Sequence, residues 1–237
     1  MLETVRLSKS FGKLRALHEV SVAMRPGQVI SLIGPNGSGK TTLLKCLLGL
    51  VMPDSGSILL RGQPVAGDWD YRRHIGYMPQ IGRYPDNMRV GQVFDMIKEI
   101  RQGSFQRLDE DLLRSFETEQ FAHKTMRTLS GGTRQKVSAC LAFLFDADVL
   151  ILDEPTAGLD PVSSEILKEK VLSEKEKGKL ILLTSHILSD LDELTTDVMY
   201  IMEGNIQFYE SLDQLKDRTG EQKLNRALAQ VMRQHAS

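Results

Sequence analysis

Residues 29–50 read VISLIGPNGSGKTTLLKCLLGL, and this stretch decides the fold. Its first part, VISLIG, is an apolar run rich in β-branched side chains, which predicts a buried strand over 29–34. A helix is expected to follow over 40–49. Between them, GPNGSGKT (34–41) matches the pattern G-x-x-x-x-G-K-[ST] in the strand-to-helix context that the pattern requires. The stretch therefore predicts a phosphate-binding loop.

The chemistry of this loop follows from its residue types. Gly34, Gly37 and Gly39 let the backbone curl so that N–H groups point at phosphate oxygens. The helix that starts near Lys40 adds the positive end of its dipole, and the Lys40 ammonium can reach the β- and γ-phosphates. The Thr41 hydroxyl can ligate Mg²⁺. The alternative is a glycine-rich turn that fits the pattern by chance, and the strand-to-helix context disfavours it.

The rest of the chain alternates short apolar runs with helical patterns, which indicates an α/β fold with a largely parallel sheet. VLILD (149–153) and LILLTS (180–185) predict two more buried strands, and VMYIM (198–202) and IQFYE (206–210) predict a hairpin around Glu203-Gly204-Asn205. Apolar residues recur at helical spacing between the first two of these strands, at Val162, Ile166, Leu167 and Val171.

More than a hundred residues separate the phosphate-type loop from the strand at 149–153, which is more than two neighbouring strands require. Apolar residues at helical spacing predict a helical insertion over about 85–145, namely Val93, Phe94, Ile97 and Ile100, then Leu108, Leu112, Leu113 and Phe116. Residues 1–30 and 55–75 are expected to form strands and turns of an antiparallel layer. We expect one domain over 1–215 and a short helical tail over 216–237.

Composition narrows the class of protein. The chain has 237 residues and a formal net charge of −1, so nucleic acid is a poor default partner. Its two cysteines, Cys46 and Cys140, have no metal-ligand spacing and are expected to be buried in a reducing compartment. The most apolar stretch, residues 43–52, is shorter than the about 20 residues of a membrane span. No signal peptide is expected at the N-terminus.

Two further motifs place polar groups at the end of a predicted strand and at the start of a predicted helix. In LILDEP (150–155), Asp153 and Glu154 come at the carboxyl end of a buried strand, where they could hold Mg²⁺ through water and polarise an attacking water. A helix N-cap with an exposed acid is the alternative. LSGGTRQKV (129–137) offers a second anion-binding nest before a helix, or simply an N-cap serine with a flexible turn.

Together these motifs resemble the ATP-binding cassette (ABC) ATPases over residues 1 to about 215, in that family's order and approximate spacing. The resemblance implies a RecA-like, mostly parallel sheet with an N-terminal antiparallel β layer and an inserted helical subdomain. It implies that ATP and Mg²⁺ are bound and that ATP is hydrolysed. In that family two cassettes pair head to tail, so each ATP lies between the phosphate loop of one chain and the LSGG signature of the other.

The resemblance also assigns roles to individual residues. Phe11 would stack on adenine, although a lone aromatic is more often a core residue. Gln80 would lie near Mg²⁺ and the attacking water, Asp160 in AGLD would face the other chain, and His186 would contact the γ-phosphate. The nucleotide would also be bound by a phosphate-loop set and a signature set, namely Asn36, Gly37, Ser38, Gly39, Lys40, Thr41, Thr42, Ser130, Gly131 and Gly132. Metal ligands would be Thr41, Gln80 and Asp153.

Departures from the family pattern are mild. Thr133 ends the signature where the family commonly has Gln, and Thr41-Thr42 stands where Ser-Thr is commoner. Both replacements keep a short polar or hydroxyl group, so neither indicates a dead site.

The resemblance implies that the chain is the ATPase subunit of a transporter. It would form a homodimer when ATP is bound, and it would dock through residues 81–95 on a separate integral membrane permease. It would lie in the cytoplasm, peripheral on the inner face of the cell membrane. AGLD and the short tail resemble cassettes of bacterial ABC-2-type exporters, and residues 67–87 resemble, more weakly, the ATPases of nitrous oxide reductase maturation. The alternatives are an ABC ATPase acting as a soluble mechanical switch and, less favoured, a nucleic-acid machine.

Overall fold

The computed structural model describes residues 1–103, 105, 107–186 and 188–235. The chain forms two compact units, one of residues 1–71 with 180–237 and one of residues 72–179. A short 3₁₀ helix, η1 (Asp70–His74), stands where the chain passes from the first to the second, so the strands and turns expected over 55–75 end before it. Among the described residues, none of the helices has the length and apolar character needed to cross a membrane.

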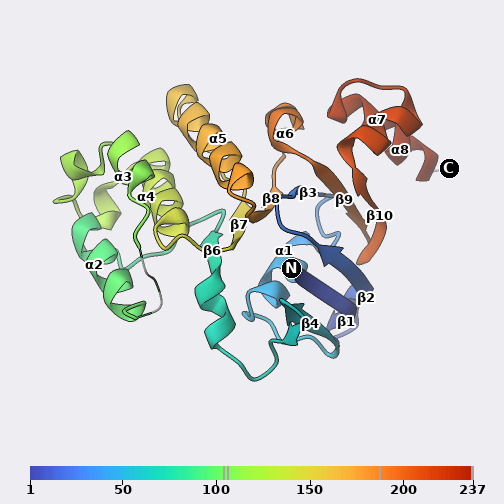
Figure 1. Ribbon diagram of the computed structural model, residues 1–237, viewed down its shortest axis with the longest axis horizontal. Helices are drawn as coiled ribbons and strands as arrows, with labels where there is room; N and C mark the ends of the chain where they lie inside the picture. The colour runs from blue at the N-terminus through green and yellow to red at the C-terminus, as the bar shows by residue number, and fades with distance from the viewer. Residues whose placement is uncertain (104, 106, 187, 236–237) are drawn as a thin grey trace. The chain divides into compact units, whose positions relative to one another are not determined.

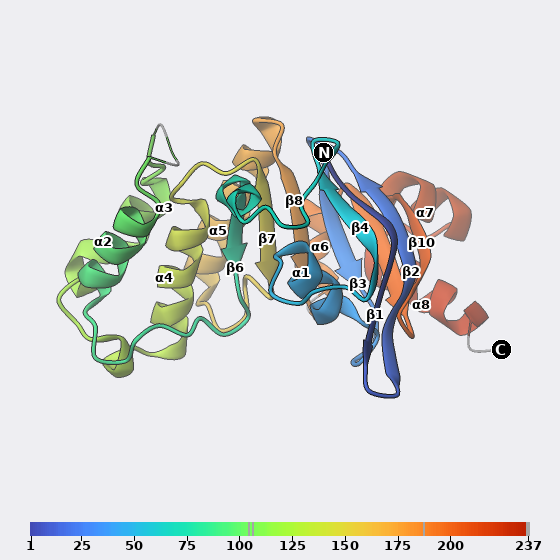
Figure 2. The same ribbon diagram turned by 90° about the horizontal axis from the view of Figure 1, so that it is seen from below.

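The first unit contains an antiparallel sheet made by the N-terminal part of the chain (Figure 2). Its strands are β1 (Leu2–Phe11), β2 (Leu14–Met24), β4 (Ser55–Leu60) and β5 (Gln63–Pro64), in the order β2-β1-β4-β5. Leu2 pairs with Met24 on one side and with Leu60 on the other, and all three side chains are buried. The expected N-terminal antiparallel layer is confirmed.

Strands of the second sheet in this unit follow the order β10-β9-β3-β8. They are β3 (Val29–Ile33), β8 (Leu180–Thr184), β9 (Asp197–Met202) and β10 (Asn205–Ser211). β3 runs parallel to both β8 and β9, while β10 returns antiparallel to β9, as the hairpin prediction required. Every residue of β3 and β8 is buried, which is typical of parallel strands covered on both faces.

Helices of the first unit are α1 (Lys40–Leu47), α6 (Leu188–Leu194), α7 (Leu212–Thr219) and α8 (Leu224–His235). The C-terminal pair α7 and α8 lies side by side (Figure 1). Ser211 begins α7 in a capping box with Gln214, and Gly220 ends it in the left-handed conformation that favours glycine. Leu224, Leu228 and Val231 bury one face of α8.

The second unit holds two parallel strands and four α-helices among its described residues. β6 (Ile75–Met78) pairs with β7 (Val149–Asp153), so that Met78 lies opposite Leu152. Its helices are α2 (Val90–Ile100), α3 (Asp111–Ser115), α4 (Gly131–Phe143) and α5 (Pro161–Glu176), with 3₁₀ turns η2 (Thr118–Phe121) and η3 (Met126–Thr128). Figures 1 and 2 both show α2, α3 and α4 gathered together.

Helical spacing located these helices but misjudged some of their faces. Leu167 and Val171 of α5 are buried as expected, whereas Val162 is 70% exposed in its first turn. Ile100 at the end of α2 is 71% exposed, and Leu108 precedes α3. Both cysteines are buried as predicted, and burial raises the pKa of the Cys46 thiol to about 11.

A buried network of charges ties α5 to the segments before α3 and after α4. The fully buried Glu174 carboxylate accepts from Lys177 at 2.7 Å, pairs with Lys170 at 3.1 Å and also pairs with Lys179. Lys170 extends the network to Asp109 at 2.5 Å. The carboxylates of Asp109, Asp146 and Glu174 lie close enough to hold a metal ion, but lysine ammonium groups already pair with each of them.

These pairings set the ionisation of Glu174. Desolvation by burial raises its pKa, but hydrogen bonds from Lys177 and Lys179 outweigh that effect and lower the pKa to about 2. The carboxylate therefore contributes stability above its ordinary pKa of 4.5, and this contribution is lost as the pH falls from there toward 2.

We predict that Glu174→Gln lowers the free energy of unfolding by about 3–5 kcal/mol at neutral pH, because three lysines lose a buried counter-charge. Glu165→Gln is the matched control, since Glu165 is exposed and pairs only at the surface with Lys168; it should cost at most about 1 kcal/mol. Urea unfolding at pH 7 and pH 3 measures both. Equal midpoints for the two variants at pH 7 would contradict the prediction.

Candidate nucleotide-binding site

The predicted phosphate loop lies between β3 and α1 in the first unit. Gly39, directly before α1, has φ +110°, and a Cβ there would lie 2.5 Å from the Ala16 carbonyl oxygen. Gly34 likewise lies against the main chain, at the Ile201 carbonyl. The loop therefore has no room for side chains at these points, and its close turn depends on glycine.

Lys40 folds back over the loop that precedes it. Its ammonium donates to the carbonyl oxygens of Gly34 at 2.7 Å and Pro35 at 3.0 Å. Inside the same loop, the Ser38 hydroxyl oxygen is buried and has no hydrogen-bond partner in the structure. A buried hydroxyl without a partner, in a loop over which an ammonium folds, is what a bound phosphate would complete, so the loop fits the phosphates of a nucleotide.

The remaining loop residues are accessible to a ligand. Asn36, Gly37 and Thr41 are exposed and Thr42 is half-buried. Thr41 lies in the first turn of α1, whose N-cap, Gly39, supplies no side-chain hydrogen bond. The first-turn N–H groups of a helix have no intrahelical acceptor, so this end of α1 favours an anion.

Phe11 ends β1 and is 50% exposed, so it is not a core residue. The Lys9 ammonium lies 5.5 Å from the centroid of its ring. An exposed ring at the end of a strand is available to stack on a planar base.

In the second unit, the strand-end carboxylates lie where the sequence predicted them. β7 ends at the half-buried Asp153, and Glu154 follows with only 7% of its surface exposed. Glu154 has φ +54°, a left-handed conformation that is unusual for a residue with a side chain. The exposed Gln80 follows the neighbouring parallel strand β6, so it comes at the same edge as the two carboxylates.

The signature stretch begins α4 in the same unit. Ser130 is the N-cap, and its hydroxyl oxygen accepts from the Thr133 N–H at 3.2 Å. Gly131 is exposed, and a Cβ on Gly132 would lie 2.7 Å from the Gly158 carbonyl oxygen. The N-cap role of Ser130 is confirmed, and the anion nest at this helix start stays a prediction.

Asp160 is the N-cap of α5, followed by Pro161 at the first helical position. Its carboxylate accepts from the Ser163 N–H at 2.9 Å and pairs with Lys136 at 3.1 Å. The Ser163 N–H and hydroxyl, and then Lys136, hold the pKa of Asp160 well below its usual range. Its N-cap role does not exclude contact with a second chain.

The first unit thus holds Phe11, the phosphate loop and His186, which is exposed two residues beyond β8. The second unit holds the remaining candidates, namely Gln80, Ser130, Gly131, Gly132, Asp153, Glu154 and Asp160. Sequence reasoning missed Gln135 and Lys136, which contact the segment after β7. They lie three and four residues after Gly132, and this helical spacing on one face was a usable signal.

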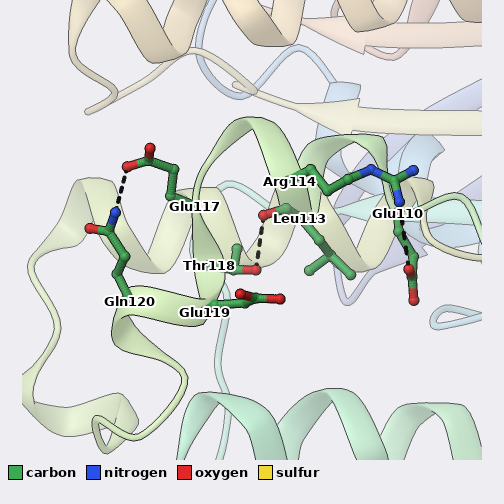
Figure 3. A pocket seen from close by; sticks show the side chains of 7 residues that line it. All are labelled: Glu110, Leu113, Arg114, Glu117, Thr118, Glu119 and Gln120. Carbon is green, nitrogen blue, oxygen red and sulfur yellow. Dashed lines mark hydrogen bonds and ion pairs between the residues drawn. The ribbon is translucent and has the colours of Figure 1, made fainter.

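A hollow of about 460 Å³ in the second unit contains none of the candidate residues (Figure 3). It lies along α3 and η2, and its polar side chains bond locally. Gln120 donates to Glu117 at 2.8 Å and Thr118 donates to the Leu113 carbonyl at 3.0 Å.

Residues 17–157 match the family described as ABC transporter. The chain is 34% identical over 208 residues to the Nod factor export ATP-binding protein I of Ralstonia nicotianae, covering 86% of this chain and 65% of that protein. It is 33% identical over 218 residues to an uncharacterized ABC transporter ATP-binding protein of Synechocystis sp., covering 87% of this chain and 61% of the relative. It therefore spans slightly less than two thirds of these relatives.

Among solved structures, an ATP-binding subunit of an ABC transporter superposes with a TM-score of 0.89 at 28% identity, over 98% of this chain and 99% of the other. A dimeric ATP-binding cassette with bound ADP and phosphate superposes with a TM-score of 0.79 at 23% identity, over 90% and 99%. The chain belongs to the ABC transporter family and has the fold of that family's ATPase cassettes. The expected fold class is confirmed.

We predict that Lys40→Ala lowers the affinity for ATP by about 10²-fold or more, because hydrogen bonds to a charged group are worth about 1.5–3 kcal/mol each. Lys45→Ala is the control, since Lys45 is an exposed lysine in the last turn of the same helix. Isothermal titration with Mg-ATP measures both. Undiminished affinity in the Lys40 variant would remove this residue from the site.

Proposed function

We propose that this chain is the ATP-binding and ATP-hydrolysing subunit of an ABC transporter. The observation that carries the proposal is the glycine-dependent loop at 34–41, with the Lys40 ammonium folded over it and the buried Ser38 hydroxyl left without a partner. Family membership makes ATP the nucleotide.

A few groups of residues share the binding of the nucleotide and of Mg²⁺. Phe11 stacks on adenine, and the loop from Asn36 to Thr42 holds the phosphates. Thr41, Gln80 and Asp153 offer hydroxyl, amide and carboxylate oxygens, the donor set that Mg²⁺ prefers. When bound, the metal neutralises charge on the phosphates.

Catalysis rests on Glu154, with Gln80 and His186 assisting. Its carboxylate takes a proton from the attacking water as that water's oxygen bonds to the γ-phosphorus and the bond to the β,γ-bridging oxygen breaks, leaving ADP and phosphate. Gln80 orients the water, and His186 and Lys40 contact the γ-phosphate. Burial of Glu154 keeps competing bulk water away from it.

A second copy of the chain completes the site. Ser130, Gly131 and Gly132 of one copy bind the γ-phosphate held by the phosphate loop of the other, and the loop ending at Asp160 lies between the two copies. Dimeric cassettes among the structures of the same fold support this arrangement.

The membrane partner docks on the second unit near residues 81–95. A hollow of about 280 Å³ opens there, lined by Pro79, Arg83, Tyr84, Ile97, Arg101 and four neighbours. Ile81 is 70% exposed beside it. Such a hollow suits a short helix of an integral membrane permease, which would place the chain in the cytoplasm on the inner face of the cell membrane. The names of the Nod factor export relatives favour an exporter.

We predict that Glu154→Gln lowers the hydrolysis rate by about 10²–10⁴-fold while ATP binding survives, because an amide cannot take a proton. Since hydrolysis removes the γ-phosphate that joins two copies, the variant should accumulate as an ATP-bound homodimer. Phosphate release and size exclusion with and without ATP measure the two effects. A wild-type rate would remove Glu154 from catalysis, and a slow variant that stays monomeric would contradict the paired site.

We predict that Ile81→Asp lowers recovery of an integral membrane protein when the tagged chain is purified from native membranes without nucleotide. Replacing this exposed isoleucine by a charged residue removes apolar area that docking would bury and adds a desolvation cost. Val162→Asp is matched in exposure, at 70%, and should leave recovery unchanged. If even the unaltered chain recovers no membrane protein, the alternative of a soluble mechanical switch gains support.

A further inference from the structure

Three contacts lock the start of α4 to the segment that follows β7. The Gln135 side-chain amide donates to the Glu154 carbonyl at 3.2 Å and to the Pro155 carbonyl at 3.4 Å. Lys136 pairs with Asp160 at 3.1 Å. Gly132 lies so close to the Gly158 carbonyl that a Cβ would meet it at 2.7 Å. Gln135, at 5% exposure, supplies the buried contact of the three.

The bond from Gln135 falls on a residue with an unusual backbone conformation. Glu154 has φ +54°, which a side chain makes unfavourable unless surrounding contacts hold it. Its carbonyl also accepts from the Ala157 N–H at 3.1 Å, which closes the turn. The Glu154 carbonyl belongs to one of the two peptide planes that flank the Glu154 Cα, so a buried amide that bonds this carbonyl, and the Pro155 carbonyl one residue on, restrains where the Glu154 side chain points.

We propose that Gln135 is a positioning residue for hydrolysis: it holds the backbone of Glu154 in the conformation that aims the carboxylate at the attacking water. The inference rests on the proposed role of Glu154 as general base. Because Gln135 stands in the helix that Ser130 begins, the same bond connects the signature, which serves one ATP, to the base that serves the other.

The expected kinetic effect follows from geometry. A general base must lie within hydrogen-bond reach of the proton that it removes, and a misplacement of about 1 Å can cost about 10²-fold in rate. The groups assigned to nucleotide binding are unchanged by a substitution at Gln135. The turnover number should therefore fall while the affinity for nucleotide stays the same.

Gln135→Met tests the proposal, because it keeps the length of the side chain and removes both donated bonds. The control is Thr118→Val in the same unit, which removes a bond at 3.0 Å from a 5% exposed side chain to the Leu113 carbonyl. Steady-state hydrolysis of Mg-ATP, ADP binding and thermal unfolding are measured for both variants. We expect a fall of about 10²-fold in kcat for Gln135→Met, unchanged ADP affinity, and a loss of thermal stability similar to that of the control.

The double variant with Glu154→Gln separates positioning from other roles. If Gln135 acts through the Glu154 carboxylate, Gln135→Met should cause little further loss once that carboxylate is gone. A wild-type kcat in Gln135→Met, or an equal loss with and without Glu154, overturns the inference. A wild-type rate in Glu154→Gln alone overturns the general-base role instead. If Gln135→Met does not fold, Gln135→Glu replaces it, because this change keeps the shape of the side chain and removes the N–H donors. The same results then support or overturn the inference.

Discussion

The structure depends on one constraint, which is that the chain must leave the buried strand β3 and enter α1 through a loop that lies against its own main chain. Gly39 at φ +110° sits where any Cβ would meet the Ala16 carbonyl, and the Ser38 carbonyl accepts from Gly204 at 2.9 Å. The antiparallel layer and the hairpin of β9 and β10 supply these contacts. These two elements therefore fix the conformation of the loop as well as supporting it.

A different constraint applies to the second unit. It must hold acidic groups at the end of a strand, next to a glycine-rich helix start. The helix α4 and the segment from Glu154 to Asp160 meet this demand by bonding to each other through a buried amide, an ion pair and a glycine contact. The charged network around Glu174 then fixes α5, whose N-cap is Asp160. Polar interactions, and not only apolar packing, thus define this half of the chain.

Much of the fold could be predicted from the sequence where strands are completely buried. The apolar runs predicted β3, β7 and β8 to within a residue, because strands buried on both faces leave an uninterrupted pattern. The pattern failed where exposure is decided by neighbours, as at Val162 and Ile100. Glycine and lysine spacing predicted a phosphate loop at 34–41. Helical spacing could place Gln135 on the same face as Gly132, but no periodicity could reveal the left-handed Glu154 or the bond from Gln135 to it, since that contact joins segments about twenty residues apart.

The position of Lys40 has a consequence for which oxygen atoms accept hydrogen bonds from its ammonium group. Its ammonium donates to the main-chain carbonyl oxygens of Gly34 and Pro35, so the loop itself supplies oxygen acceptors for this charge. Under the proposed function, phosphate oxygens would offer acceptors of the same kind, and the charge would meet no apolar surroundings in either arrangement. An incoming nucleotide would then meet a loop whose shape its glycines and main-chain contacts already fix.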